Sequence, residues 1–351
     1  MAAQRDGKGF ERVTKASEDG ERAQRPRERP RARSGEAAAG LPPVVLVTGP
    51  TAGGKSRLAL DLAEAFGGSV INADALQVYR ELEILTARPG AAALARAPHR
   101  LYGVLPAGEA CSAGRWQALA LAEIEAAREA GRLPIVAGGT GLYLQALERG
   151  LSAIPEIAEE IRTAVRRRHR ELGGTAFHAA LAARDPQAGA RLRPSDSQRL
   201  MRAWEVLEAT GRSLFDWQRD SPQAPPYRFL RLALMPPREA LYAACDRRFL
   251  EMLEAGALVE VERLLALGLD PGLPAMKAVG VAELGAHLAG EIALEEAVAR
   301  AQQATRRYAK RQYTWLRGQG IGARLFDAQY SESLKGEIFN IICDFVLTPS
   351  G

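Results

Sequence analysis

The chain has 351 residues, of which 47% are apolar and 25% charged, with a formal net charge of +5. This length predicts two or three structural units, and the composition excludes a chain that is disordered throughout. No apolar stretch approaches the roughly 18 consecutive residues that a membrane span needs, and the polar N-terminus does not resemble a secretory signal peptide, so we expect a cytoplasmic protein without membrane contact.

The positive charge is concentrated at the N-terminus. Residues 1–40 contain ten Lys and Arg against seven Asp and Glu, which gives +3 and leaves +2 for the other 311 residues. Because this segment has few large apolar residues, we predict a disordered basic tail. Its composition fits a passive extension better than a nucleic-acid-binding arm.

After residue 40, the hydrophobic pattern of the sequence predicts strands and helices that alternate along the chain. Short buried strands are predicted at residues 44–47, 69–73, 133–137 and 228–234. Helices are predicted from residue 54, over 112–130 with Ser112 as N-cap, and over 238–255, 258–266 and 294–316. This order predicts an α/β fold with a parallel sheet, whose chemistry sits at the carboxyl ends of the strands.

The chain divides into a core and two further regions. Residues 41–154 with 212–320 are predicted to form the core and its C-terminal helices, and residues 155–211 a helical insertion. Residues 321–351 are weakly patterned, and we assign them no element. The cysteines Cys111, Cys245 and Cys343 form no CxxC pair, which excludes a zinc module and predicts inert buried thiols in a reducing compartment.

A phosphate-binding loop follows the first strand. Residues 49–56 read G-P-T-A-G-G-K-S, a complete G-x-x-x-x-G-K-[ST] motif between a strand and a helix. Backbone N–H groups in such a loop surround a phosphate, Lys55 adds a positive charge, and the Ser56 hydroxyl can reach Mg²⁺. The motif therefore predicts a phosphate or diphosphate site.

The ends of the other strands carry the remaining candidates. The strand at 133–137 ends in glycines rather than in the acid that holds Mg²⁺ in many P-loop ATPases. Asp74 ends the second strand, where it could bind Mg²⁺, act as a general base or cap a helix. Thr140 offers a hydroxyl at the same edge.

Two basic regions suggest a nucleic-acid partner. Arginines crowd the insertion between residues 162 and 170, and residues 297–326 hold seven Lys and Arg with no acid. Tyr308, Tyr313 and Trp315 lie among the basic residues of the last long helix. This pattern fits an RNA backbone with unstacked bases, or equally a solvated helix whose aromatic side chains pack into the core.

Taken in order, these motifs resemble the tRNA dimethylallyltransferase family, bacterial type. The resemblance spans about residues 43–317. It rests on residues 49–56, 74–80, 86–89, 99, 138–143, 193–199, 202, 210–211, 245–248, 252, 256, 306–312 and 314–315. Four residues depart from the family pattern, namely Gly53, Ala75, Val281 and Ala282.

The resemblance implies a P-loop-like core and a specific reaction. The dimethylallyl group of dimethylallyl diphosphate passes to N6 of the adenosine 3′ of the anticodon, position 37, in tRNAs that read codons beginning with U. Mg²⁺ is the implied cofactor, with Ser56 as its ligand, and the protein is expected to be a monomer that binds the tRNA anticodon stem-loop. Adenylate isopentenyltransferases, P-loop kinases or ATPases, and non-catalytic RNA-binding proteins are the alternatives.

The resemblance also implies roles for individual residues. Asp74 would be the base, supported by Lys55, Thr140 and Arg248. The diphosphate would be bound by Gly49, Pro50, Thr51, Ala52, Gly53, Gly54, Lys55 and Ser56. The tRNA would be contacted by Asp74, Ala75, Leu76, Gln77, Thr140, Arg162, Gln198, Arg199, Leu200, Met201 and Arg202.

Overall fold

A parallel six-stranded sheet forms the centre of the protein. The computed structural model describes residues 40–220, 223–319 and 322–348, so the predicted tail lies almost wholly outside the described residues. The strand order is β3-β2-β4-β1-β5-β6, and every pair is parallel. The strands are β1 (Pro43–Thr48), β2 (Ser69–Asn72), β3 (His99–Arg100), β4 (Pro134–Gly138), β5 (Arg228–Leu234) and β6 (Arg324–Phe326). The predicted fold class is confirmed.

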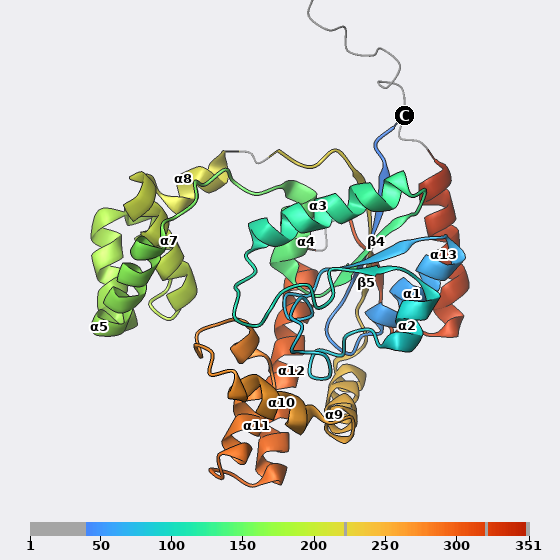
Figure 1. Ribbon diagram of the computed structural model, residues 1–351. Coiled ribbons are helices and arrows are strands. Elements are labelled where there is room, and N and C mark those ends of the chain that lie inside the picture. Colours follow the sequence, from blue (N-terminus) through green and yellow to red (C-terminus); the bar gives the residue numbers. More distant parts are fainter. Residues whose placement is uncertain (1–39, 221–222, 320–321, 349–351) are drawn as a thin grey trace, which may run out of the picture. The chain divides into compact units, whose positions relative to one another are not determined.

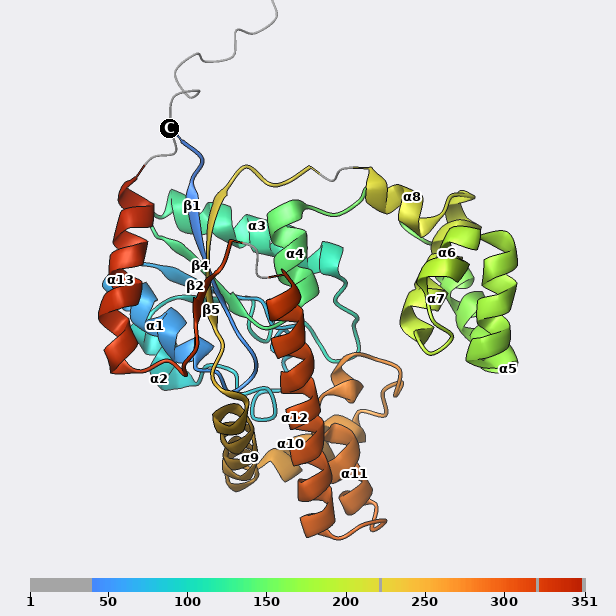
Figure 2. The ribbon, with the colours of Figure 1, turned by 180° about the vertical axis from the view of Figure 1, so that it is seen from behind.

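Helices cover both faces of this sheet (Figures 1 and 2). On one side lie α1 (Lys55–Ala65), α2 (Ala91–Arg96) and α13 (Glu332–Leu347), and on the other α3 (Ala113–Glu129) and α4 (Gly141–Arg149). Strand β1 serves both faces, because Val44 and Leu46 pack in one hydrophobic cluster and Val45 and Val47 in the other. A strand buried on both faces must be apolar at every position, which explains the uninterrupted run.

Capping starts α3 where the sequence predicts it. Ser112 has an extended backbone and its Oγ accepts a hydrogen bond from the Arg115 N–H at 3.1 Å. The remaining helices of the core follow β5. They are α9 (Arg238–Glu254), α10 (Ala257–Ala266), the 3₁₀ turn Ala275–Lys277, α11 (Val281–Leu288) and α12 (Leu294–Gln319).

The weakly patterned C-terminal region contains two elements that the sequence analysis missed. Strand β6 pairs with β5, and α13 buries Ile338 and Ile342 in the same cluster as α1. A strand of three residues is too short to show a period, and α13 contains several β-branched residues, which have low helix propensity. Packing against α1 and the sheet decides the structure of this segment.

We expect Ile338→Ala to lower the free energy of unfolding by about 2–5 kcal/mol, because its side chain is fully buried and its removal leaves a cavity. Urea denaturation measures this change. The control is Leu347→Ala in the same helix, where the side chain is 78% exposed, so that the change should stay within about 0.5 kcal/mol. Equal effects of the two substitutions would contradict the packing of α13.

The predicted insertion forms a hydrophobic cluster of its own. Its helices are α5 (Glu159–Arg184), α6 (Pro186–Arg191), α7 (Ser197–Thr210) and α8 (Leu214–Arg219). Phe177 and Leu200 are fully buried in this cluster, which also contains Leu214 and Phe215. We therefore propose that the insertion extends to about residue 220 rather than ending at 211.

Within the described residues, no helix is long and apolar enough to cross a membrane. The prediction of buried thiols is confirmed for Cys245 and wrong for Cys343. Cys245 is buried, Cys111 is partly buried and Cys343 is exposed, because Cys343 lies on the outer side of the amphipathic helix α13.

Candidate active site at the carboxyl edge of the sheet

The predicted phosphate loop connects β1 to α1. The Gly53 N–H and the Lys55 ammonium both donate to the Pro50 carbonyl oxygen, at 3.1 and 2.7 Å. Gly54 has a φ of 92°, and a Cβ there would lie 3.0 Å from the Cβ of Tyr330. This position therefore needs glycine for both its backbone conformation and its space.

Two cations and one carboxylate meet beside this loop. Burial lowers the pKa of Lys55 to about 8 and also lowers the pKa of Arg248, while the negative charge of Asp74 opposes both shifts. The Arg248 guanidinium donates to Thr51 Oγ1 at 3.4 Å. The structure thus brings together residues that are far apart in the sequence, as the motifs predict.

The affinity for inorganic diphosphate should fall as the pH rises above about 8, because Lys55 loses its proton there and with it the positive charge. Calorimetric titration at pH values on either side of 8 measures this affinity. A Lys55→Met variant is the control, since its pH dependence reports only the ionisation of diphosphate itself. Identical pH profiles for the two proteins would contradict the assignment.

Asp74 lies in a turn directly after β2. The buried Asn72 amide fixes this turn, since its Oδ1 accepts from the Asp74 N–H at 2.8 Å and its Nδ2 donates to the Asp74 carbonyl at 3.0 Å. One carboxylate oxygen of Asp74 accepts the Leu76 N–H at 3.0 Å. Residues 75–78 form turns rather than a helix, so the helix-capping alternative is wrong. No pattern in the sequence around Asn72 indicates this role.

A cavity of about 70 Å³ lies between Asp74 and the phosphate loop. Thr51, Asp74 and Arg248 supply its polar groups. Apolar side chains form much of the rest of the wall, together with Thr86, Thr305 and Tyr308. They are Ala52, Leu76, Leu85, Cys245, Phe249, Met252, Ala278 and Val279. A cavity lined by both charged and apolar side chains suits a ligand that combines an anionic group with a hydrocarbon chain.

Thr140 joins the loop after β4 to the Asp74 turn. Its Oγ1 accepts the Ala75 N–H at 2.9 Å, and its own N–H donates to the Ala73 carbonyl at 3.2 Å. It does not belong to the lining of the cavity described above. Gln77 is also engaged within the protein, since its Nε2 donates to the Thr86 carbonyl at 2.8 Å.

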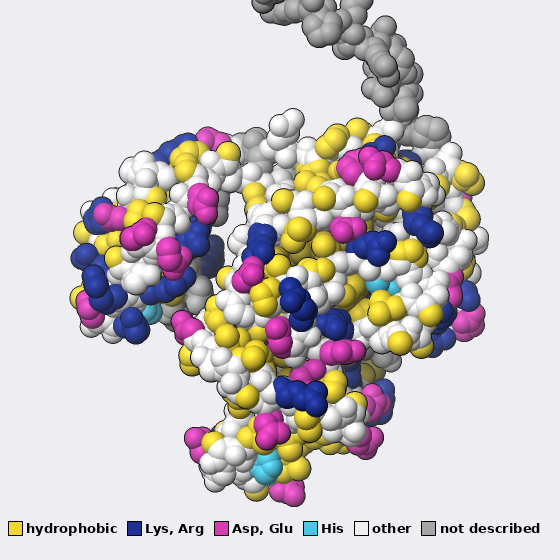
Figure 3. Space-filling model, viewed as in Figure 1, with side chains coloured by type: hydrophobic (Ala, Val, Ile, Leu, Met, Phe, Trp, Pro, Cys, Tyr) yellow, Lys and Arg dark blue, Asp and Glu magenta, His cyan; other side chains and the backbone are white. Residues whose placement is uncertain are grey.

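The other predicted tRNA-contacting residues lie on the insertion helices and do not line the Asp74 cavity. Gln198 and Arg199 are exposed, whereas Arg162 and Arg202 form ion pairs with Glu159 and Glu205. Leu200 is fully buried and Met201 packs against the insertion cluster, because they lie on the inner face of α7. The Leu200 side chain is therefore not available for the predicted RNA contact. Figure 3 shows many Lys and Arg side chains over these helices.

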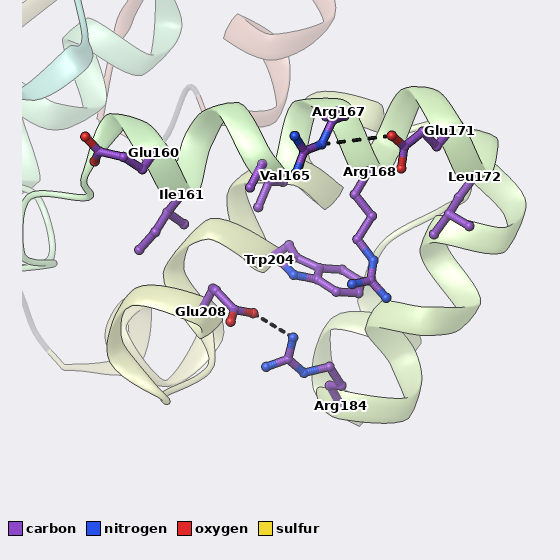
Figure 4. A pocket seen from close by; sticks show the side chains of 11 residues that line it. Glu160, Ile161, Val165, Arg167, Arg168, Glu171, Leu172, Arg184, Trp204 and Glu208 are labelled. Carbon is purple, nitrogen blue, oxygen red and sulfur yellow. Dashed lines mark hydrogen bonds and ion pairs between the residues drawn. The ribbon is translucent and has the colours of Figure 1, made fainter.

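A second hollow, of about 620 Å³, lies along α5 and α7. The guanidinium groups of Arg168 and Arg184 lie 4.6 and 5.4 Å from the centre of the Trp204 ring, and Arg184 also pairs with Glu208 (Figure 4). Three arginines and three glutamates line the hollow. Since these charges balance, we assign it no ligand.

Helix α12 contributes side chains to the candidate site that the sequence analysis did not assign. Tyr308 lines the cavity, and Gln312 hydrogen-bonds to the phosphate loop. Tyr313 and Trp315 pack in hydrophobic clusters, and Arg306 pairs with Asp246 at 2.5 Å. The core-packing interpretation therefore holds for these two aromatic side chains, while Arg307, Lys310 and Arg311 stay exposed.

A parallel sheet with a G-x-x-x-x-G-K-S loop at its carboxyl edge defines a P-loop-like phosphate-binding enzyme. The family model described as IPP transferase matches residues 77–319. A tRNA dimethylallyltransferase of Rhodospirillum centenum is 62% identical over 287 residues, which cover 81% of this chain and 91% of that protein. One of Rhodospirillum rubrum is 54% identical and covers 89% and 98%.

Solved structures agree with these relatives. The tRNA isopentenylpyrophosphate transferase of Bacillus halodurans has a TM-score of 0.64 and 32% identity, over 87% of this chain and 96% of that one. A eukaryotic dimethylallyltransferase acting on tRNA has a TM-score of 0.75 and 26% identity, over 87% and 79%. The chain belongs to the tRNA dimethylallyltransferase family, and the predicted resemblance is confirmed.

Proposed function

We propose that this protein transfers the dimethylallyl group of dimethylallyl diphosphate to N6 of adenosine 37 in tRNA. The observation that carries this proposal is the cavity beside the phosphate loop, whose lining includes Asp74, Arg248 and several apolar side chains. The phosphate loop fits the diphosphate, and the wall formed by Leu76, Leu85 and Met252 fits the five-carbon chain.

The cations stabilise the leaving group. As the allylic C–O bond breaks, negative charge grows on the diphosphate, and it would be stabilised by Lys55, Arg248 and those loop N–H groups that, unlike the N–H groups of Thr51 and Gly53, are not bonded within the protein. Burial of Lys55 and Arg248 strengthens this interaction, because fewer water molecules screen their charges. The helix α1, which begins at Lys55, adds the positive end of its dipole.

Asp74 takes the proton of the attacking amine. The N6 nitrogen forms a bond to C1 of the allyl group, the C1–O bond breaks with its electron pair passing to diphosphate, and one N6 proton moves to the Asp74 carboxylate. The Leu76 N–H and the Asn72 amide hold this carboxylate and its backbone in place. The target base must leave its stack to reach such a cavity.

The residues present fit Mg²⁺. Among the described residues no group of three or more His, Cys, Asp or Glu could hold a metal ion. Mg²⁺ keeps several waters and binds substrate phosphates, so the exposed Ser56 hydroxyl and the diphosphate suffice. When bound, the ion would add positive charge at the leaving group.

The insertion supports a tRNA substrate rather than a mononucleotide. Gln198, Arg199, Arg202 and Arg162 lie on its helices and contribute polar and basic groups that a free nucleotide does not need. We propose that they contact the anticodon stem-loop, and that the protein acts as a cytoplasmic monomer. The proposed diphosphate-binding residues are Gly49, Pro50, Thr51, Ala52, Gly53, Gly54, Lys55 and Ser56. The proposed tRNA-contacting residues near the cavity are Asp74, Ala75, Leu76, Gln77 and Thr140.

Label transfer tests this function against its alternatives. The protein is incubated with labelled dimethylallyl diphosphate and either an anticodon stem-loop or AMP. We expect label only in the RNA. Label in AMP alone would indicate an adenylate isopentenyltransferase, and ATP hydrolysis without prenyl transfer would indicate a P-loop ATPase.

A further inference from the structure

One face of α12 is directed at the candidate site. Its members Thr305, Tyr308, Gln312 and Trp315 recur at intervals of three and four residues, which is the spacing of one helix face. Thr305 and Tyr308 line the cavity, and the Trp315 ring lies against Gly141. Gln312 does not line the cavity, and its amide is bonded to two loops of the site instead.

Gln312 connects two loops of the site. Its Oε1 accepts the Thr51 N–H of the phosphate loop at 2.8 Å, and its Nε2 donates to the Gly139 carbonyl at 3.0 Å. The side chain is polar yet only 6% exposed. Since these bonds use both ends of one rigid amide, they fix the separation between the two loops.

The space around the amide is closed. A Cβ at Gly139 would lie 2.2 Å from Gln312 Nε2 and 3.2 Å from the Gly49 carbonyl oxygen. Glycine at this position therefore leaves the space that the Gln312 amide fills between the strand ends of β1 and β4.

The contact continues to Asp74. Thr140, which follows Gly139, accepts the Ala75 N–H and donates to the Ala73 carbonyl. Both residues that flank Asp74 are therefore hydrogen-bonded to Thr140. Gln312 thereby joins the loop that holds the leaving group to the turn that carries the base.

We propose that Gln312 is a positioning residue that sets the distance between the diphosphate loop and Asp74. This inference rests on the proposed function. Prenyl transfer needs the amine, the allylic carbon and the leaving group in line, and small misplacements of such groups reduce the rate strongly. Gln312 acts through Thr51 and Gly139 and touches no reacting atom.

Steady-state kinetics of Gln312→Met test the proposal. Methionine has a similar volume and makes neither hydrogen bond, so kcat should fall about tenfold or more while KM for tRNA stays within about twofold. The matched control is Gln302→Met on the same helix, whose amide donates to the Asp246 carbonyl at 3.1 Å. The control should keep its kcat, and equal kcat values for the two variants would overturn the proposal.

A second variant changes Gly139, the other partner in the same contact. In Gly139→Ala the new Cβ displaces the Gln312 amide, so this substitution should also lower kcat. The kcat of the double variant should be only slightly lower than the kcat of the less active single variant, because both substitutions break the same contact. If the two substitutions lowered kcat independently, so that their effects on the activation free energy added up in the double variant, the proposal would be overturned. Should Gln312→Met fold poorly, the kcat of Gly139→Ala alone tests the same contact, and an unchanged value would overturn the proposal.

Diphosphate binding separates this inference from the proposed function. If the unaltered protein transfers no prenyl group, the proposed function fails, and binding of inorganic diphosphate then tests Gln312. An affinity at least about threefold weaker in Gln312→Met than in Gln302→Met would support the loop-positioning role. Equal affinities would overturn it.

Discussion

Asp74→Asn is expected to lower the rate of prenyl transfer by about 10²-fold or more and to leave tRNA binding intact. Asparagine keeps an oxygen that can accept the Leu76 N–H, so the turn after β2 should persist while the proton acceptor is lost. Single-turnover kinetics with labelled dimethylallyl diphosphate measure the rate, and filter binding measures the affinity for the anticodon stem-loop.

The chain offers a matched control for this substitution. Asp270 closes a similar turn, with its Oδ1 accepting the Gly272 N–H at 2.7 Å, on an exposed segment. Asp270→Asn should therefore leave the rate unchanged. A rate for Asp74→Asn equal to that of this control would show that Asp74 serves only to hold its turn.

Arg248→Met should reduce kcat by about 10²–10³-fold, because the methionine removes a buried positive charge next to the breaking C–O bond. The KM for dimethylallyl diphosphate should rise as well, since the guanidinium also binds the ground-state diphosphate. Initial rates at several substrate concentrations separate the two effects.

The neighbouring arginine is the control. Arg247 is exposed and pairs with Glu251 one turn away on α9, so Arg247→Met should change kcat by less than about twofold. If Arg248→Met behaved like Arg247→Met, the negative charge of the leaving group would have to be stabilised by Lys55 and the loop alone.

Strands β1, β2, β4 and β5, together with Asp74 and the phosphate loop at their ends, could be predicted from the sequence because their signals are local. A strand buried on both faces gives a short apolar run, as in β1 and β4, and strand ends carry Asp74 and the phosphate loop to one edge. Strand β6 and helix α13 gave no such signal, because contacts with α1 and β5 determine their structure.

The contacts that complete the site could not be predicted in this way. The bond from Thr51 to Gln312 joins residues 261 positions apart, and nothing in the local sequence of either marks it. Asn72 stands inside a predicted strand, where its amide gives no indication that it holds Asp74. Leu200 shows the opposite error, because a motif position was assigned to RNA although the helix period places it in the core.

The phosphate loop is held from both sides by the far end of the chain. Gln312 accepts the Thr51 N–H, and the Gln329 amide donates to the carbonyl of Ala52, a residue with a φ of 60° that is unfavourable for alanine. Because a chain is synthesised from its N-terminus, the loop is made long before its two partners, which lie 261 and 277 residues further along the chain. The site that would bind diphosphate is therefore completed only after the helices that would meet the RNA have been made.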